Sequence, residues 1–239
     1  MTESFPRHKA ATRNFQLGAP RTLAISSDAA LVSFLRSAHG RDPVNSLWVY
    51  DRDAGVERKV ADPRELLADA DNIPAAERAR RERMRETTSG ITAYTRDDSG
   101  RLAAFTVGGG LYLADLTHGT VQALNVTGPV IDPHLSPDGQ CIAWSTGEQV
   151  RLWSTADGEQ VLTPNDGGTW GLADFVAAEE LGRVHGLWWS PQSDALLIER
   201  FDDSMVESIW LADPATPEVE PRPHRYPFAG TTNATVTLH

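Results

Sequence analysis

The sequence predicts an all-β fold built from repeated units of four short strands, and three observations support this. The chain has 239 residues, of which 40 % are hydrophobic, so it can bury a substantial core. An apolar strand, a turn rich in Ser, Asp, Pro and Gly, and a second alternating strand recur four times as a hairpin pattern. A third apolar run that contains an aromatic residue follows each hairpin.

The repeated elements can be placed along the chain in order. The hairpins are expected at residues 23–36, 92–107, 133–146 and 187–200, and the third strands at 46–51, 110–115, 149–154 and 208–213. The first three units continue into a fourth strand, within residues 52–62, 117–126 and 156–165. Four strands per repeat are typical of β-propeller blades. A β-sandwich would have a similar density of strands but not the same turn-and-strand order four times.

The longest interruption of the repeat lies between the first and second units. Residues 74–86 are rich in Ala, Arg and Glu, contain no Gly and begin with Pro, which predicts a helix within an insertion at about 65–88. The simplest interpretation of its arginines is a solvated face with glutamate partners at helical spacing, namely Arg80, Arg81, Arg83 and Arg85 with Glu77, Glu82 and Glu86. Residues 1–20 precede the first strand as an N-terminal extension.

Composition limits the classes of partner and location. The net charge of −11 argues against nucleic acid or an anionic membrane as the main partner and favours a small cationic ligand. The single Cys141 excludes an internal disulfide framework and is expected to be a small buried strand residue. No signal region and no membrane-length apolar run are present, so we expect a cytoplasmic location.

Two adjacent carboxylates, Glu179 and Glu180, lie in a second insertion, just before the fourth hairpin. Adjacent side chains diverge by about 100° on a helix, so they can converge only on a ligand that approaches a turn or a helix end. A primary ammonium, with one charge and three donors, suits such a pair. A divalent metal is less suited because no His or Asp stands at ligand spacing around the pair. Taken alone, two adjacent glutamates are more simply a solvated helix face.

Several segments resemble the dipeptidyl peptidase IV branch of the prolyl oligopeptidase family, in particular its cytosolic members. The segment FVAAEELGRVHGLWWSP resembles the glutamate motif and the Trp-Trp-Ser-Pro strand of that family. RRERMRETTSGITAY is similar to its arginine-rich helix and the strand that follows. The other similar segments, in the same order as in the family, are GPVIDPHLSPDG, ERFDDSMVESIWL and RYPFAGTTNATVTL. The resemblance covers roughly residues 74–239.

The resemblance implies a serine exopeptidase that removes dipeptides ending in Pro or Ala from peptides with a free N-terminus. It implies that Glu179 and Glu180 bind the α-ammonium of the substrate, and that one arginine among Arg81, Arg83 and Arg85, with Arg85 the first choice, binds a backbone carbonyl. The family's propeller has eight blades, so this chain would be a partial β-propeller with about four blades and an inserted Arg-rich helix. The resemblance implies no cofactor or metal, and a homodimer is compatible with the complete enzyme.

Two departures from the family pattern matter. The residue before the glutamate pair, often Glu or Gln in relatives, is Ala178. No Gly-x-Ser-x-Gly elbow occurs, so the Ser-Asp-His triad of the C-terminal α/β-hydrolase domain is absent and the chain is not expected to be catalytic by itself. His134 and His185 are interpreted as structural or surface residues. The alternative is a non-enzymatic propeller that acts as an interaction scaffold. The scaffold alternative predicts a closed fold of repeats, whereas the exposed sheet edges of a partial propeller predict poor solubility or association of the isolated chain.

Overall fold

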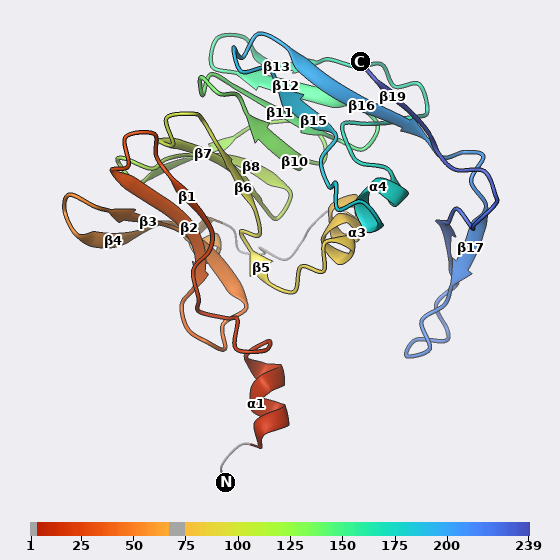
Figure 1. Cartoon of the computed structure of the whole chain (residues 1–239), viewed down its shortest axis with the longest axis horizontal. Helices are drawn as coiled ribbons and strands as arrows, with labels where there is room; N and C mark the ends of the chain where they lie inside the picture. The colour runs from red at the N-terminus through yellow and green to blue at the C-terminus, as the bar shows by residue number, and fades with distance from the viewer. Residues whose placement is uncertain (1–3, 67–74) are drawn as a thin grey trace.

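β-Sheets that follow one another along the chain dominate the structure, a computed structural model that describes residues 4–66 and 75–239. Figure 1 shows them as an arc running from the N-terminal to the C-terminal colours, with α3 (Ala75–Arg83) and α4 (Phe175–Glu179) on its inner side. The helix α1 (Phe5–Ala11) projects away from the sheets. Among the described residues, no helix has both the length and the hydrophobicity needed to cross a membrane. The predicted all-β class is confirmed.

Three sheets each consist of four consecutive antiparallel strands. The first contains β1 (Arg21–Ile25), β2 (Leu31–Ser37), β3 (Val44–Asp51) and β4 (Val56–Ala61), with β5 (Ser89–Gly90) added in parallel to β3. The second contains β6 (Tyr94–Arg96), β7 (Leu102–Val107), β8 (Gly110–Asp115) and β9 (Thr120–Leu124). The third contains β10 (Ile131–Leu135), β11 (Cys141–Ser145), β12 (Val150–Ser154) and β13 (Gly158–Val161). The hairpins predicted from alternation and turn residues are present in all three.

The core lies between neighbouring sheets and not within one sheet. Leu35 and Leu47 of the first sheet share a buried cluster with Phe105 of the second. Leu111 of the second sheet shares another with Trp144 of the third, whose side chain is fully buried. Burial of this kind stabilises a folded chain by about 1.5–3 kcal/mol for each large apolar side chain. Each sheet therefore buries part of its apolar surface against its neighbour.

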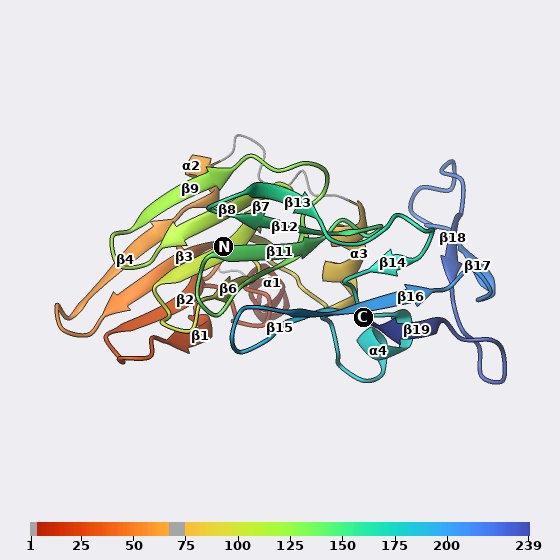
Figure 2. The same cartoon turned by 90° about the horizontal axis from the view of Figure 1, so that it is seen from above.

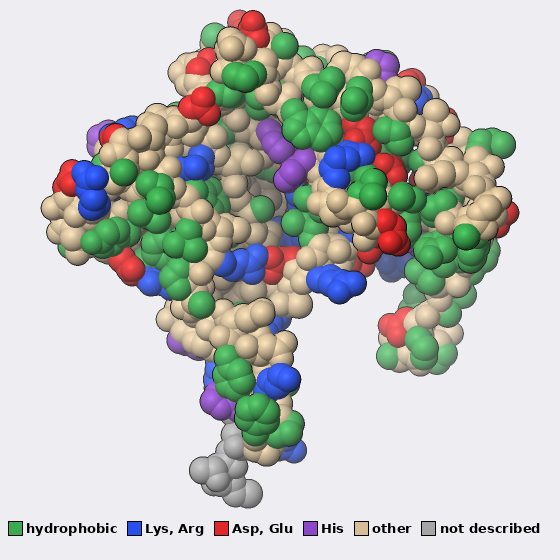
Figure 3. All heavy atoms as spheres, viewed as in Figure 1, with side chains coloured by type: hydrophobic (Ala, Val, Ile, Leu, Met, Phe, Trp, Pro, Cys, Tyr) green, Lys and Arg blue, Asp and Glu red, His purple; other side chains and the backbone are tan. Residues whose placement is uncertain are grey.

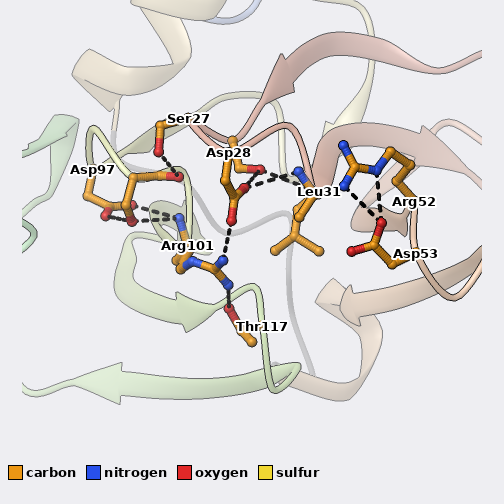
Figure 4. Close-up of polar contacts among 11 residues, drawn as sticks. Ser27, Asp28, Leu31, Arg52, Asp53, Asp97, Arg101 and Thr117 are labelled. Atoms are coloured by element: carbon orange, nitrogen blue, oxygen red, sulfur yellow. Dashed lines mark hydrogen bonds and ion pairs between the residues drawn. The ribbon is translucent and has the colours of Figure 1, made fainter.

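Hydrogen bonds also connect the hairpin turns of successive sheets. The backbone N–H of Ser27 donates to the carbonyl of Ser99 over 3.1 Å, and that of Asp98 donates to Pro137 over 2.8 Å. The N–H of Asp138 then donates to Ser193 Oγ over 3.0 Å. Figure 4 shows the first of these junctions, where the Arg101 guanidinium also reaches the carboxylate of Asp28. The turns that recur in the sequence thus lie side by side in space.

The fourth unit departs from the expected pattern. The hairpin of β15 (Leu187–Trp189) and β16 (Leu196–Asp202) forms as predicted. The next strand, β17 (Ser208–Leu211), was expected beside β16 but instead forms a separate pair with β18 (Arg222–Arg225), at the right of Figure 2. That prediction is wrong. β14 (Thr169–Trp170) and β19 (Thr235–Leu238) pair with β16.

The last strand, β19, lies along the edge of β16 beside which β17 was expected. Residues 235–238 lie antiparallel to 199–202. Because β17 does not pair with β16, the backbone groups of β16 would be unpaired along that edge, and β19 supplies their partners. The edge of β16 that β17 leaves unpaired thus determines where β19 joins the sheet.

The insertion after the first sheet contains α2 (Pro63–Leu66) and α3. α3 ends at Arg83, three residues before the predicted end at Glu86, and Arg85 has a left-handed backbone with φ of 53°. The predicted start, Pro74, lies outside the described residues. The interpretation of the arginines as one solvated face is wrong for Arg80 and Arg81, which are buried. Ion pairing with buried carboxylates, and not apolar packing, makes this burial possible.

Candidate functional site

The glutamate pair lies at the exposed end of a short helix. Asp174 caps the N-terminus of α4, and its carboxylate accepts hydrogen bonds from the N–H groups of Val176 at 3.0 Å and Ala177 at 3.2 Å. Glu179 is the last helical residue and Glu180 is the C-cap. Both glutamate side chains are exposed. A helix end is one of the two positions at which adjacent carboxylates can approach a single ligand.

Arg183 anchors the segment that carries the pair. Its guanidinium contacts the carboxylate of Glu199 on β16, which is only 1 % exposed, and lies 3.3 Å from the carboxylate of Asp174. Its backbone N–H donates to the carbonyl of Ala177 over 3.0 Å, just before the glutamates. The N–H of Asp174 donates to Glu199 over 3.2 Å. One buried carboxylate therefore positions both the start of α4 and the loop that follows it.

α3 faces the glutamate segment from the other insertion. Burial lowers the pKa of the Arg83 guanidinium, and the negative charge of Glu179 partly offsets this, so the two groups lie within electrostatic reach of each other. Arg83 also lines a small pocket together with Ala178, the residue before the pair. The structure thus brings together two segments that are almost a hundred residues apart in the sequence.

The three candidate arginines have different surroundings. Arg81 is buried and its Nε donates to Glu77 over 2.9 Å. Arg83 is half-buried near Glu179. Arg85 is exposed, and within residues 4–66 and 75–239 no ion pair or side-chain hydrogen bond holds its guanidinium. The guanidinium of Arg81 is already paired with Glu77, whereas that of Arg85 is exposed and can contact a ligand.

The segment after Arg85 is fixed to the first sheet. Glu86 forms an ion pair with Arg21 of β1, and its carboxylate accepts from the N–H of Thr88 at 2.7 Å. Burial raises the pKa of Glu86, but the hydrogen bonds from Arg21 and Thr88 outweigh burial and bring the pKa below its ordinary value. The backbone on the C-terminal side of Arg85 is therefore anchored while its side chain is exposed.

A second polar cluster, which the sequence analysis did not identify, lies beside α3. Asp132 of β10 is buried, and its carboxylate contacts Arg80 at 2.5 Å, His134 Nε2 at 3.0 Å and His185 Nδ1 at 2.7 Å. Burial raises the pKa of Asp132, but the hydrogen bonds to both histidines and the charge of Arg80 bring it well below its usual range. Histidine side chains lie in the central hollow in Figure 3, next to side chains of both charges.

Comparison with known proteins agrees with this architecture. Residues 91–239 match the family model described as "Dipeptidyl peptidase IV (DPP IV) N-terminal region". This chain belongs to that family. The chain is 32 % identical over 148 residues to a probable dipeptidyl peptidase 4 of Neosartorya fischeri. This alignment covers 54 % of the chain and 19 % of the relative. It is 31 % identical over 189 residues to dipeptidyl peptidase 8 of Mus musculus. This second alignment covers 66 % of the chain and 21 % of the relative.

A solved structure shows the same fold as this member of the family. The crystal structure of Porphyromonas gingivalis dipeptidyl peptidase 4 superposes on this chain with a TM-score of 0.66 and 18 % sequence identity. The superposition covers 100 % of this chain and 33 % of the Porphyromonas gingivalis chain. The chain spans about one fifth of the length of the two curated relatives. The family resemblance derived from the glutamate, arginine and Trp-Trp segments is confirmed, and it applies to an N-terminal portion of such proteins.

Some residues around the candidate site could not be found by their local pattern. Asp174 was readable as an N-cap before the helical run that ends in the glutamates. Glu199 gave no such signal, because it is an isolated glutamate in a strand. Asp132 and His185 are separated by 53 residues, so no spacing rule joins them.

Proposed function

We propose that this chain is the substrate-recognition part of a serine dipeptidyl peptidase that removes Xaa-Pro or Xaa-Ala dipeptides from the N-terminus of peptides. In this proposal residues 21–239 form part of a β-propeller and residues 1–20 are an extension that precedes it. A C-terminal α/β-hydrolase domain of the complete protein supplies the Ser, Asp and His of an acyl-enzyme mechanism. The chain itself binds the substrate and does not perform the chemistry.

The proposed propeller is supported by the way in which successive sheets are joined. Three consecutive four-stranded antiparallel sheets each share a buried cluster with the next unit. Their hairpin turns are connected one to the next by hydrogen bonds in which a backbone N–H donates to a backbone carbonyl or, at the last junction, to the Ser193 hydroxyl. In these three sheets the order of the four antiparallel strands follows the sequence, as radially arranged blades require.

The observation that carries the proposed recognition role is the placement of Glu179 and Glu180 on an anchored, exposed helix end opposite a cationic helix. Arg183 and Glu199 fix the position of the segment, so little ordering is needed when a ligand binds. Two carboxylates at one point repel each other, and a substrate ammonium relieves that repulsion while donating up to three hydrogen bonds. A free N-terminus would therefore be held at a fixed distance from the reacting bond.

Arg85 is the arginine best placed for a substrate carbonyl. Arg85 follows the end of α3, has a left-handed backbone and has an exposed side chain. The next residue, Glu86, holds the chain to β1 through its ion pair with Arg21. Arg81 would have to abandon Glu77 in order to bind a substrate, and would leave that carboxylate buried without its partner. We assign the carbonyl contact to Arg85 on this basis, while Arg83 interacts electrostatically with Glu179.

The test uses the protein joined to its hydrolase domain and chromogenic Gly-Pro and Ala-Pro substrates. Glu179→Ala and Glu180→Ala should each lower kcat/KM about 10- to 100-fold, because a charge-assisted hydrogen bond contributes about 1.5–3 kcal/mol. Glu218→Ala, at another exposed glutamate, should leave kcat/KM unchanged. Wild-type rates in both variants of the pair would refute the ammonium contact.

A blocked substrate separates ammonium recognition from a general loss of activity. Acetylation of the substrate N-terminus removes the cation, so the wild-type protein should discriminate strongly against the acetylated peptide. The variants of Glu179 and Glu180 should lose most of that discrimination. If the extended protein hydrolyses neither peptide, the alternative of a non-enzymatic interaction scaffold is supported instead.

A further inference from the structure

We propose that Asp132, His134 and His185 form a binding site for a divalent transition-metal ion such as Zn²⁺. The three side chains each offer one ligand atom, and these atoms all lie within 4.8 Å of one another. Two imidazole nitrogens and one carboxylate oxygen are a ligand set that zinc and related metals accept. The site is separate from the glutamate pair, and the inference does not depend on the proposed peptidase function.

The separations are close to those that a metal requires. His134 Nε2 lies 3.0 Å and His185 Nδ1 lies 2.7 Å from the same oxygen, Oδ2, of Asp132. Ligand atoms about 2.0–2.1 Å from a tetrahedral zinc ion lie about 3.3 Å from each other. The two nitrogen-to-Oδ2 separations therefore need to lengthen by a few tenths of an ångström, and the two nitrogens lie within 4.8 Å of each other. The two ring protons that now face Asp132 are released or move to the opposite ring nitrogens.

The surroundings hold the ligands in place before any metal arrives. Arg80 contacts Oδ1 of Asp132 at 2.5 Å, which leaves Oδ2 for the metal and orients the carboxylate as an outer-shell partner. The carbonyl of His134 accepts a hydrogen bond from Trp189 Nε1 over 3.0 Å. The two imidazole rings lie edge to face with centroids 5.0 Å apart. A site with fixed ligands loses little conformational entropy when it binds an ion.

The positive charge of Arg80 repels a metal cation, but the carboxylates around the cluster offset this repulsion. Glu77 is buried, lies 3.6 Å from Arg80, and has one carboxylate oxygen without a hydrogen bond. Arg81 binds the other oxygen of Glu77. The buried carboxylates of Asp132 and Glu77 thus balance the two guanidiniums, and the metal meets neutral surroundings.

The cluster is accessible and selects among metals by its nitrogen ligands. It lines a cavity of about 430 Å³, and the His185 side chain is 45 % exposed. The cavity leaves room for a water molecule or a small anion at the remaining coordination position. Mg²⁺ and Ca²⁺ prefer sets of oxygen ligands and are not expected to bind here.

Titration calorimetry of the purified 239-residue chain with ZnCl₂ tests the site. We expect one Zn²⁺ per chain, an at least tenfold loss of affinity in His134→Ala and in His185→Ala, and no heat with MgCl₂. His118→Ala is the matched control, because His118 also contacts a carboxylate, Asp115, at 2.7 Å but has no second histidine beside it. This control should bind Zn²⁺ like the wild type.

X-ray absorption at the zinc edge gives a second readout that does not depend on affinity. Two imidazoles in the first coordination shell support the site, and fewer than two contradict it. Circular dichroism confirms that each histidine variant is folded, which Asp132→Ala cannot guarantee because Arg80 would lose its buried partner. No zinc binding by the wild type, or equal affinity in the His134 and His185 variants, overturns the proposal.

Discussion

Arg183 and Glu199 form a contact between an exposed loop and a nearly inaccessible strand carboxylate. Glu199→Gln should therefore lower the free energy of unfolding by about 2 kcal/mol. Breaking a fully buried pair costs about 3–5 kcal/mol, and the 36 % exposure of the Arg183 side chain reduces that cost through solvent screening. Urea unfolding monitored by tryptophan fluorescence measures the change. Glu148→Gln, at an exposed glutamate that accepts a hydrogen bond from the Asn165 side chain, should change stability by less than about 0.5 kcal/mol.

Glu86 should contribute a pH-dependent part of the stability. Its pKa in the folded state is lowered, so the stabilisation is fully present above the ordinary glutamate pKa of about 4.3 and is lost as the pH falls through the lower folded value. Glu86→Gln should thus be less stable than the wild type at pH 7, with the difference shrinking at pH 4 and again at pH 3. Urea midpoints at the three pH values measure this. A constant difference would contradict the ion pair with Arg21.

Arg81 and Arg85 should respond differently to the same substitution. Arg81→Ala removes the partner of the buried Glu77 and should reduce stability, whereas Arg85→Ala should change the melting temperature little. If Arg85 binds the substrate carbonyl, its loss should lower kcat/KM of the extended protein about 10-fold or more. Thermal unfolding and kinetics of both variants provide the comparison. A wild-type kcat/KM in Arg85→Ala would transfer the assignment to Arg83.

Gly100 should be the most sensitive glycine at the junction of the first two sheets. Its φ is 70°, and an added Cβ would lie 2.7 Å from the Cα of Ser26 in the neighbouring turn. Gly119, with φ of 73°, has nothing nearer than Arg58 at 3.9 Å. Both alanine variants incur the backbone cost of about 1–2 kcal/mol, and Gly100→Ala should lose about 1–3 kcal/mol more because the turns must separate. Equal unfolding free energies would show that the turns are not tightly packed.

Local patterns were sufficient to predict the repeated hairpins. Alternating apolar residues around a turn such as Ser136–Pro137–Asp138–Gly139 specify both the strands and their register, because the Ser136 hydroxyl and the Asp138 carboxylate bond to nearby backbone groups. For the glutamate segment the sequence left two positions open, a turn or a helix end, and the structure has the helix end, since Asp174 is a strong N-cap and the run that follows is helical.

Long-range pairing could not be predicted in the same way. The position of β19 depends on the edge that β17 leaves free on β16, and both edges look alike in sequence. The burial of Arg80 depends on Asp132, more than fifty residues away. Hydrophobic periodicity cannot reveal a polar side chain that is buried by ion pairing, so the arginine-rich helix was interpreted as more exposed than it is.

The hydrogen bonds between successive hairpin turns affect the order in which the sheets unfold. Among the residues that the structure describes, each sheet shares buried clusters with the sheets on either side of it, so the cost of opening one unit depends on how many neighbours it has. The second sheet, containing Phe105 and Leu111, has a neighbour on both faces, whereas the first has one. Amide protons of β7 and β8 should accordingly exchange with solvent more slowly than those of β2 and β3, and opening should begin at the ends of the array.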